Sequence, residues 1–380
     1  MGFFSTKIEE EVIAVLDISS GSVSGALFLK DRKKLPFILA TASKKIRTRE
    51  SVNASVLQKE IMETIDHICA ELQKNALIKP SKIYCVLSVP WAHGELRSIH
   101  LKKEKEFQFT ENYAQKLILA EITKLQNEIK KDLQIIDKKI TKVSLNGYNV
   151  KSPHGQKTTS AVLEIFLSFA NKNLIHDIED KVHKTFKSKI FFTSQMMADF
   201  VFARDSMTSS KDALILNIGA EVTEVVFNKG DYMTSTAFFP YGANNLIRSM
   251  ALKLGKSLGE TESLFRLYND NSLDMQSEEL IEGAATFATD AWQSYLKRVL
   301  SEVLPTRHLP QTVFVLAPQE VASWIGSKIS NEFFPEFTTG HTEFDVIIPS
   351  TKTLHDFYDK TELAKPNTDI LIKTIYINQV

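Results

Sequence analysis

The sequence is poor in cysteine and has no excess of charge of either sign. Its 380 residues include 2 cysteines, Cys69 and Cys85, which do not fit the disulfide framework of a small secreted domain. Lys plus Arg and Asp plus Glu are equal at 46 each, so the basic excess that a nucleic-acid binder needs is absent. The 9 histidines show no metal-ligand spacing with the cysteines. We expect two buried free thiols and no nucleic-acid partner.

Long apolar runs are missing as well. No stretch approaches the ~18 consecutive apolar residues that indicate a membrane-spanning helix, and no signal-peptide pattern is present. No pair of carboxylates and no Ser-His-Asp or Cys-His arrangement stands out. The sequence therefore predicts no transmembrane segment and offers no candidate for a catalytic residue.

Strands and helices alternate in the first part of the chain. Apolar and β-branched residues dominate 12–18, 23–29 and 36–41, with turn residues between them. An apolar stripe at helical spacing then runs through 54–74. The segment "KIYCVLSVP", at 82–90, contains the continuous apolar run of a strand covered on both faces. This order predicts an α/β architecture, and the chain is too long for a single core.

A change of composition at Trp91 marks an insertion. Residues 91–109 are polar and charged, and Thr110 is a candidate N-cap for a long helix that we expect to continue to Leu133. Two strands, "KVSLNGYNV" and "AVLEIFLSF", and an amphipathic helix at about 172–187 come next. These elements predict a small inserted α+β subdomain over residues 91–187.

The α/β pattern resumes after the insertion. The segment "KIFFTSQMMADFVFARD" predicts a short strand and a helix, and residues 243–303 predict a long helical region. The segment "TVFVLAP" predicts a strand, with the helix "EVASWIGSKIS" behind it. Near the C-terminus, "FDVIIPS" and "DILIKTIYI" both look like strands. We expect the second of these to be either the last core strand or an edge strand that a partner can exchange.

Two segments, "EVIAVLDISSGSVSGALF" and "KDALILNIGAEVTEVVF", share one pattern of strand, small-residue turn and strand. Backbone N–H groups in such a turn converge on anionic oxygens, and glycine lets the backbone approach closely. An acidic residue at the strand end can hold Mg²⁺ through water. Two such turns that face each other would clamp a nucleotide. The candidate cofactor-binding residues are Asp17 (also the candidate metal ligand), Ser19, Ser20, Gly21, Ser22, Asn217, Gly219, Ala220, Thr223 and Gly242.

These turns and the insertion resemble the actin-like ATPase superfamily, and within it the bacterial FtsA and PilM branch. The pair "LNGYNVKSPHGQKTTSAVLEIFLSF" is similar to the N-G-Y…P-x-G-K strand pair of that branch's inserted subdomain. The stretch "GDYMTSTAFFPYGANNLIRSMALKLGKSLGETESLFR" resembles the family's stretch after its second phosphate loop. A short leader before the first turn favours the PilM side. The resemblance covers most of residues 8–330 and rests on the order and spacing of the motifs.

The resemblance implies two actin-like (ribonuclease H-like) domains that face each other across a cleft. The expected divisions are a first lobe of residues 8–90 with 188–211 and part of 319–380, the FtsA/PilM-type subdomain 91–187, and a second lobe of 212–318 that includes the helical region 243–303.

The chain departs from the family in both phosphate loops. Ser19 stands where the family has glycine, Asn217 replaces an acidic residue, and Ala220 replaces a second glycine. Ala317-Pro318 replaces the Gly-Gly of the adenosine loop, and proline has no N–H to offer. Asn217 cannot supply the negative charge that helps to hold Mg²⁺. ATP and Mg²⁺ are thus the cofactors that the resemblance implies, while the departures predict a degenerate site with weak or absent hydrolysis.

Several of these residues also have plainer interpretations. The serines of the first turn fit an ordinary hairpin, and Gly242 fits a turn before a helix. Glu224 is either a solvent-exposed carboxylate at a strand end or a replacement for the family's aspartate.

The resemblance implies a scaffold at the cytoplasmic face of a bacterial membrane that recruits partners for type IV pilus or related envelope assembly. The inserted subdomain would offer a groove to the cytoplasmic peptide of a membrane protein, and self-association is a further expectation. One alternative is an active ATPase of the FtsA cell-division kind, or another ATP-dependent phosphotransferase of the same fold. The other is an interaction protein unrelated to pili or division.

Overall fold

The first lobe is built on a six-stranded sheet. The computed structural model describes residues 11–75, 78–128, 131–206, 212–304, 308–331, 337 and 343–380; the leader before the first turn lies outside them. The strand order is β15-β3-β2-β1-β4-β9, in which β1 pairs antiparallel with β2 and parallel with β4. The strands are β1 Glu11–Ile18, β2 Ser22–Lys30, β3 Phe37–Lys45, β4 Lys82–Leu87, β9 Lys189–Ser194 and β15 Asp359–Lys360.

The second lobe repeats this sheet. Its order is β12-β11-β10-β13-β14, and β10 again pairs antiparallel with one neighbour and parallel with the other. The strands are β10 Ala213–Ile218, β11 Thr223–Lys229, β12 Tyr232–Phe239, β13 Thr312–Leu316 and β14 Asp345–Ile347. The order matches β3-β2-β1-β4-β9 strand for strand, so the duplication predicted from the two turns is confirmed.

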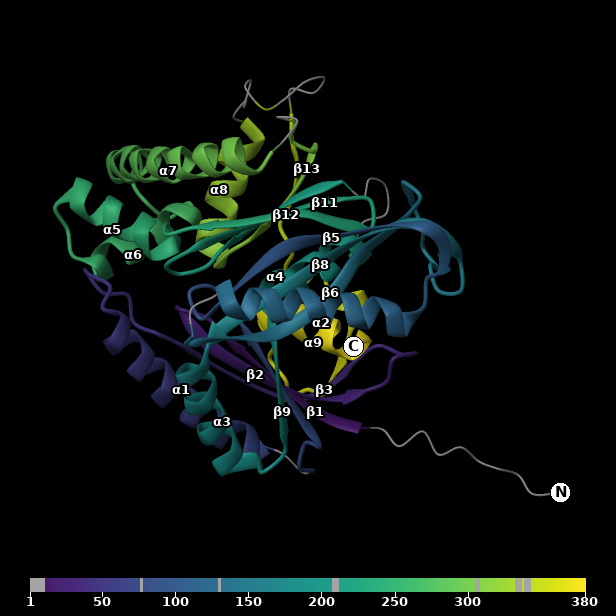
Figure 1. Cartoon of the computed structure of the whole chain (residues 1–380). Helices are drawn as coiled ribbons and strands as arrows, with labels where there is room; N and C mark the ends of the chain where they lie inside the picture. The colour runs from purple at the N-terminus through teal and green to yellow at the C-terminus, as the bar shows by residue number, and fades with distance from the viewer. Residues whose placement is uncertain are drawn as a thin grey trace.

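Helices cover the outer faces of both sheets (Figure 1). On the first sheet these are α1 Ala54–Asn75 and α3 Lys172–Phe186, whose apolar stripes bury Cys69 and Cys85 as free thiols. On the second they are α5 Ala243–Leu254, α6 Leu258–Asn269, α7 Met275–Val303 and α8 Gln319–Asn331. No helix within the described ranges is both long and apolar enough to cross a bilayer.

Two helices lie between the sheets. Helix α9 Thr368–Gln379 packs on β1 and β2, α4 Gln195–Ser206 packs on β10 and β11, and the two helices pack against each other. The apolar side chains of both sheets and both helices form one continuous core. The lobes are therefore joined through α4 and α9, and a short 3-10 turn at His355–Phe357 precedes α9.

The predicted C-terminal strand "DILIKTIYI" is wrong, because this segment is helix α9. Its residues Ile370 to Asn378 are all buried, so apolar side chains occur all around the helix and the helical period disappears. The isoleucines and the tyrosine favour a strand when judged by propensity alone. The side chain of Asn367 caps the helix by accepting from the N–H of Ile370 at 2.9 Å. The exchangeable edge strand is thereby excluded.

The inserted subdomain is a four-stranded sheet with α2 Glu111–Glu128 against it, in the order β5-β8-β6-β7. Its strands are β5 Ala92–Gln108, β6 Leu133–Leu145, β7 Tyr148–Asn149 and β8 Lys157–Asn171. The charged stretch 91–109, which we did not predict as a strand, contains β5. Most residues in the second half of this strand are exposed, so its sequence lacks the alternation of apolar and polar residues that indicates a strand. The predicted continuation of the helix to Leu133 is wrong, because Leu133 begins β6.

Candidate functional site

The two predicted phosphate turns lie against each other. The first turn, residues 19–22, comes after β1, and the second turn, residues 219–222, comes after β10. The backbone N–H of Glu221 donates to Ser20 Oγ across the interface at 3.3 Å. A Cβ added to Gly21 would lie 2.5 Å from the Cβ of Ala220. The turns therefore touch where the resemblance places a polyphosphate between them.

Helix α5 begins directly on the second turn. The N–H groups of Ala243 and Asn244 donate to the carbonyl oxygens of Gly219 and Ala220, both at 2.8 Å. Two of the free donors at a helix N-terminus, which often bind anions, are thereby used within the chain. Gly242 permits this contact, since an added Cβ would lie 2.3 Å from the carbonyl oxygen of Gly219.

The hydroxyl of Thr223 is also used internally. It donates to the carbonyl of Tyr241 at 2.6 Å and accepts from Trp292 Nε1 at 3.0 Å. Thr223 is fully buried, and these two bonds fix it within the core of the second lobe. Its side chain therefore serves the packing of the lobe.

A buried ionic cluster joins the two lobes behind the turns. Lys373 of α9 donates to Asp199 Oδ1 of α4 at 3.0 Å, and neither side chain is more than 2% exposed. Asn217, at the end of β10, donates through Nδ2 to Asp199 Oδ2 at 2.6 Å. Asp17, at the end of β1, lies in the field of both Lys373 and Asp199. Asp17 and Asn217 thus face the same ion pair from opposite lobes.

Asn217 has a structural role that an aspartate at this position would lose. An ionised carboxylate has no proton to donate to Asp199, whereas an amide nitrogen does. The Asn217–Asp199 contact explains why the second turn differs from the first by one charge.

Glu224 also belongs to this region, which makes the prediction of a solvent-exposed carboxylate wrong. It is 4% exposed, and its Oε1 accepts from the backbone N–H of Val89 at 3.0 Å. Glu224 lies on β11 of the second lobe and Val89 comes shortly after β4 of the first, so this bond crosses between the lobes. We call the set Asp17, Asp199, Asn217, Glu224 and Lys373 the lobe junction.

The lobe junction holds more carboxyl groups than cations. Burial raises the pKa of Asp17 to about 7 against the opposing pull of Lys373, and burial with the charge of Asp199 raises the pKa of Glu224 to about 8. Burial alone would lower the pKa of Lys373, but the negative charges of Asp199, Asp17 and Asp369 outweigh burial and hold this pKa above its usual value. Because unfolded carboxyls titrate near pH ~4, the folded state binds more protons between about pH 4 and pH 8. The stability that these two carboxyls contribute therefore falls as the pH rises through that window.

The residues at the junction are poorly matched to ATP and Mg²⁺. Lys373 already places a positive charge beside Asp17, the candidate metal ligand. The hydroxyls of Ser20 and Thr223 and the first donors of α5 have partners within the chain. Within the described residues, no group of three or more His, Cys, Asp or Glu is arranged to hold a metal ion. The chain's own groups thus take most of the places that the resemblance assigns to a ligand, while Asp17 Oδ1 is buried without a hydrogen-bond partner.

An arginine also joins the lobes at the second turn. Arg248 of α5 donates through both terminal nitrogens to the carboxylate of Glu221, each at 2.8 Å. Its Nε donates to the carbonyl of Arg49 in the first lobe at 2.6 Å. Thr48 adds a bond to Asn244 at 3.2 Å.

The sequence did not lead us to predict Arg248, Asp199 or Lys373 as residues of this site. For Asp199 and Lys373, the available signal was a single charged residue inside an apolar run.

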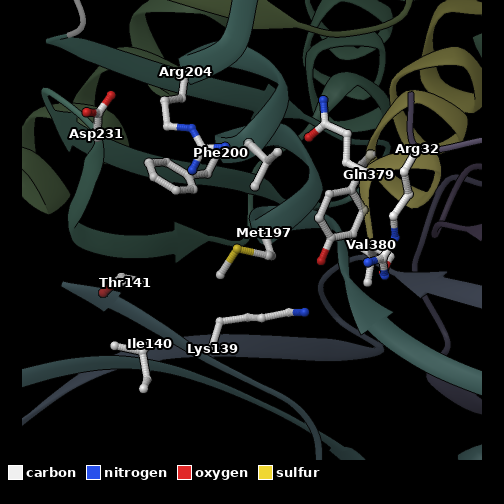
Figure 2. A pocket seen from close by; sticks show the side chains of 12 residues that line it. Arg32, Lys139, Ile140, Thr141, Met197, Phe200, Arg204, Asp231, Gln379 and Val380 are labelled. Atoms are coloured by element: carbon white, nitrogen blue, oxygen red, sulfur yellow. The ribbon is translucent and has the colours of Figure 1, made fainter. Parts of the chain in front are cut away.

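A groove of about 390 Å³ lies between the subdomain and the first lobe (Figure 2). Residues Lys139, Ile140 and Thr141 of β6 line one side, and α4 lines the other with Met197, Phe200, Val201 and Arg204. The groove is completed by Arg32, Asp231, Tyr376, Gln379 and Val380. It therefore combines an apolar wall with Asp231 and three cationic side chains. Of these cations, Arg204 is paired with Asp205, and Arg32 donates to the carbonyl of Val380.

Replacing Asn217 with aspartate is expected to destabilise the protein strongly at pH 8 and weakly at pH 5.5. At pH 8 the ionised carboxylate of the variant would face Asp199, and an uncompensated buried charge costs about 3 kcal/mol or more. At pH 5.5 a protonated carboxyl can donate to Asp199 as the amide does. Thermal melts at the two pH values measure the difference. The control Asn217→Ala loses the bond without adding charge and should lower the Tm by a similar amount at both pH values. If Asn217→Asp lowered the Tm equally at both pH values, the Asn217–Asp199 geometry would be contradicted.

Comparisons with known proteins agree with this architecture. No protein-family model and no curated protein matches the sequence. Among solved structures, a chain of the "PilM-PilN type IV pilus biogenesis complex" is similar, with a TM-score of 0.63 and 12% identity over 97% of this chain and 98% of that chain. The ethanolamine utilization protein EutJ from Carboxydothermus hydrogenoformans is similar with a TM-score of 0.46 and 10% identity, over 96% and 88% of the two chains.

A Bacteroides thetaiotaomicron protein of unknown function with an actin-like ATPase fold is similar with a TM-score of 0.40 and 8% identity, over 99% of both chains. The predicted PilM-like, actin-like fold of two duplicated domains is confirmed by the first of these similarities and by the repeated strand order.

Proposed function

We propose that this chain is a scaffold protein of the PilM type with weak or absent ATP hydrolysis. It would bind the cytoplasmic segment of a membrane protein at the inner face of a bacterial membrane, during assembly of type IV pili or a related envelope structure. The observation that carries the proposal is the lobe junction, where the ion pair of Lys373 and Asp199 bonds to Asn217 and acts electrostatically on Asp17, at the ends of the strands that lead into the two turns. The similarity to the PilM–PilN complex over nearly the whole of both chains supports the choice of partner.

The alternative is an active ATPase of the FtsA kind or an ATP-dependent phosphotransferase on the same fold. Such an enzyme needs both turns free to receive phosphates and a carboxylate able to hold Mg²⁺. Here the turns contact each other at Gly21 and Ala220, and the carboxyl of Asp17 has a raised pKa. Both observations favour the scaffold.

Isothermal titration of the full chain with ATP and Mg²⁺ is expected to give no measurable heat of binding. The reason is that the turns, the Thr223 hydroxyl and the α5 N-terminus have internal partners. We also expect no rise in Tm with about 1 mM nucleotide, a concentration at which a micromolar ligand would add about 4 kcal/mol of stability. Micromolar binding accompanied by turnover would overturn the degenerate site and support the alternative.

The groove is the best candidate for the partner segment. Figure 2 shows Lys139 extending along it below Met197, with Arg204 beside Asp231 at one end. Strand β6 pairs with β8 along one edge, while β7 pairs only with Ser144 and Leu145 at its end. Elsewhere, among the described strands, the second edge of β6 has no pairing partner, and an extended peptide can add to such an edge. We infer an extended segment with apolar side chains and at least one carboxylate.

Reversing the charge of Lys139 is expected to weaken binding of that segment about tenfold or more, since close charge pairs across an interface are worth more than a kilocalorie. Lys139 lines the groove, while its exposed neighbour Lys138 is absent from the lining. Lys139→Glu would place a carboxylate against the acidic ligand, and Lys138→Glu is the matched control for the change of net charge. Fluorescence anisotropy with the labelled cytoplasmic segment of a PilN-like protein from the same genome measures both. If Lys139→Glu and Lys138→Glu bound the segment with equal affinity, the groove would not be its binding site.

A further inference from the structure

Helices α4 and α9 each carry residues of the groove and residues of the lobe junction. On α4, Phe200 and Arg204 line the groove while Asp199 bonds to Asn217 and Lys373. On α9, Tyr376 lines the groove, and Lys373 lies almost one turn earlier at the junction. The same two helices thus carry residues of both places.

Both helices are held firmly along their length. They pack against each other inside the core shared by the two sheets. At the end of α9, Asn378 donates to the carbonyls of Asp31 and Lys34 at 3.0 and 2.9 Å. The hydroxyl of Thr193 donates to Asp137 of β6 at 2.6 Å and lies 3.4 Å from the Tyr376 hydroxyl. Closely packed helices of this kind shift as bodies, so a movement at one face reaches the other.

The groove also includes a residue from the second lobe. Asp231 lies in the turn between β11 and β12, and it contributes to the groove beside Arg204 of the first lobe (Figure 2). Lys151 of the subdomain lies 3.4 Å from the carboxylate of Asp231. Separation of the lobes would move Asp231 relative to α4 and change the shape and charge of the groove.

We propose that α4 and α9 couple the groove to the lobe junction, so that a peptide in the groove and the closed arrangement of the lobes stabilise each other. This rests on the proposed function in one respect, that the groove is the peptide site. The coupling is reciprocal: whatever loosens the junction weakens the groove, and a peptide in the groove tightens the junction. The internal ion pair of Lys373 and Asp199 then holds the closed state that a nucleotide would otherwise support.

The test loosens the lobes at a point that touches neither helix nor groove. Arg248→Ala removes the bonds to Glu221 in the second turn and to the Arg49 carbonyl in the first lobe. Asn217→Asp loosens the junction itself. The matched control is Arg298→Ala, whose guanidinium packs on Tyr295 at 5.0 Å within helix α7 of the second lobe. Hydrogen exchange measured by mass spectrometry on the full chain monitors residues 195–206, 368–379, 19–22 and 219–222.

We expect exchange in 195–206 and 368–379 to rise roughly fivefold or more in Arg248→Ala, the lower end of ordinary coupling strengths, and to stay unchanged in Arg298→Ala. Faster exchange at the two turns without a change in the helices would overturn the coupling. Unchanged exchange everywhere in both Arg248→Ala and Asn217→Asp would overturn it as well, because these contacts would then not hold the lobes. This measurement needs no peptide, so it decides the coupling even where the labelled segment fails to bind.

Discussion

Replacing Lys373 with methionine is expected to lower the free energy of unfolding by roughly 3–5 kcal/mol, the usual cost of removing one partner of a buried ion pair. Methionine keeps much of the length of the side chain, so the loss comes from charge. Asp199 would remain buried at 1% exposure with only the amide of Asn217 as partner, and Asp17 would lose a cation that stabilises its charge. Urea unfolding followed by circular dichroism measures the change.

Two further variants separate the ion pair from other causes. Lys365→Met, at an exposed lysine just before α9, should change stability by less than about 0.5 kcal/mol. Adding Asp199→Asn to Lys373→Met should restore part of the loss, since a neutral pair leaves no uncompensated charge. A double variant that is as unstable as the sum of the single variants would show that Lys373 acts through packing alone.

Replacing Gly242 with alanine is expected to be the most disruptive change of a single methyl group at the turns, costing about 3 kcal/mol. The added Cβ would lie 2.3 Å from the carbonyl oxygen of Gly219 and 2.6 Å from the carbonyl carbon and oxygen of Ala220. These are backbone atoms that cannot rotate away. Gly242 has a φ of −124°, which alanine adopts freely, so the cost arises from the clash and not from the backbone conformation.

Gly283 provides the control for Gly242. It lies inside α7, and an added Cβ there meets nothing within 4 Å. Gly283→Ala should therefore stabilise the helix by up to about 1 kcal/mol. Thermal melts should show a lower Tm for Gly242→Ala and an equal or higher Tm for Gly283→Ala. If Gly242→Ala had the same Tm as the wild type, the close approach of α5 to the second turn would be refuted.

The sequence predicted the features that depend on neighbouring residues. The pairs β1–β2 and β10–β11 were visible because each is an apolar strand, a small-residue turn and a second strand within about 20 residues. The lobe junction was not visible, because Asn217 and Asp199 are 18 residues apart and Lys373 lies 174 residues from Asp199. Residues this far apart in sequence are not neighbours within one helix or one strand, so only folding of the two lobes brings these groups together.

The identity of the turn residues was informative in a different way. Asn217 and Ala220 depart from the family pattern, and from the sequence these departures predict only weaker binding of metal and phosphate. The structure adds what each residue does instead: the amide of Asn217 donates to Asp199, and the methyl group of Ala220 fills the space beside Gly21. The clue that remained unused was Lys373, the single charged side chain between Ile370 and Ile377.

The position of α9 between the sheets has a consequence for synthesis of the chain on the ribosome. Asn378 at the end of this helix bonds to Asp31 across 347 residues of sequence. Until α9 emerges, the inner face of the first sheet and the face of α4 that packs on α9 are uncovered and apolar. From the synthesis of the first sheet until residues 368–379 are made, the nascent chain therefore exposes an incomplete apolar core, the kind of surface that aggregates unless a chaperone binds it.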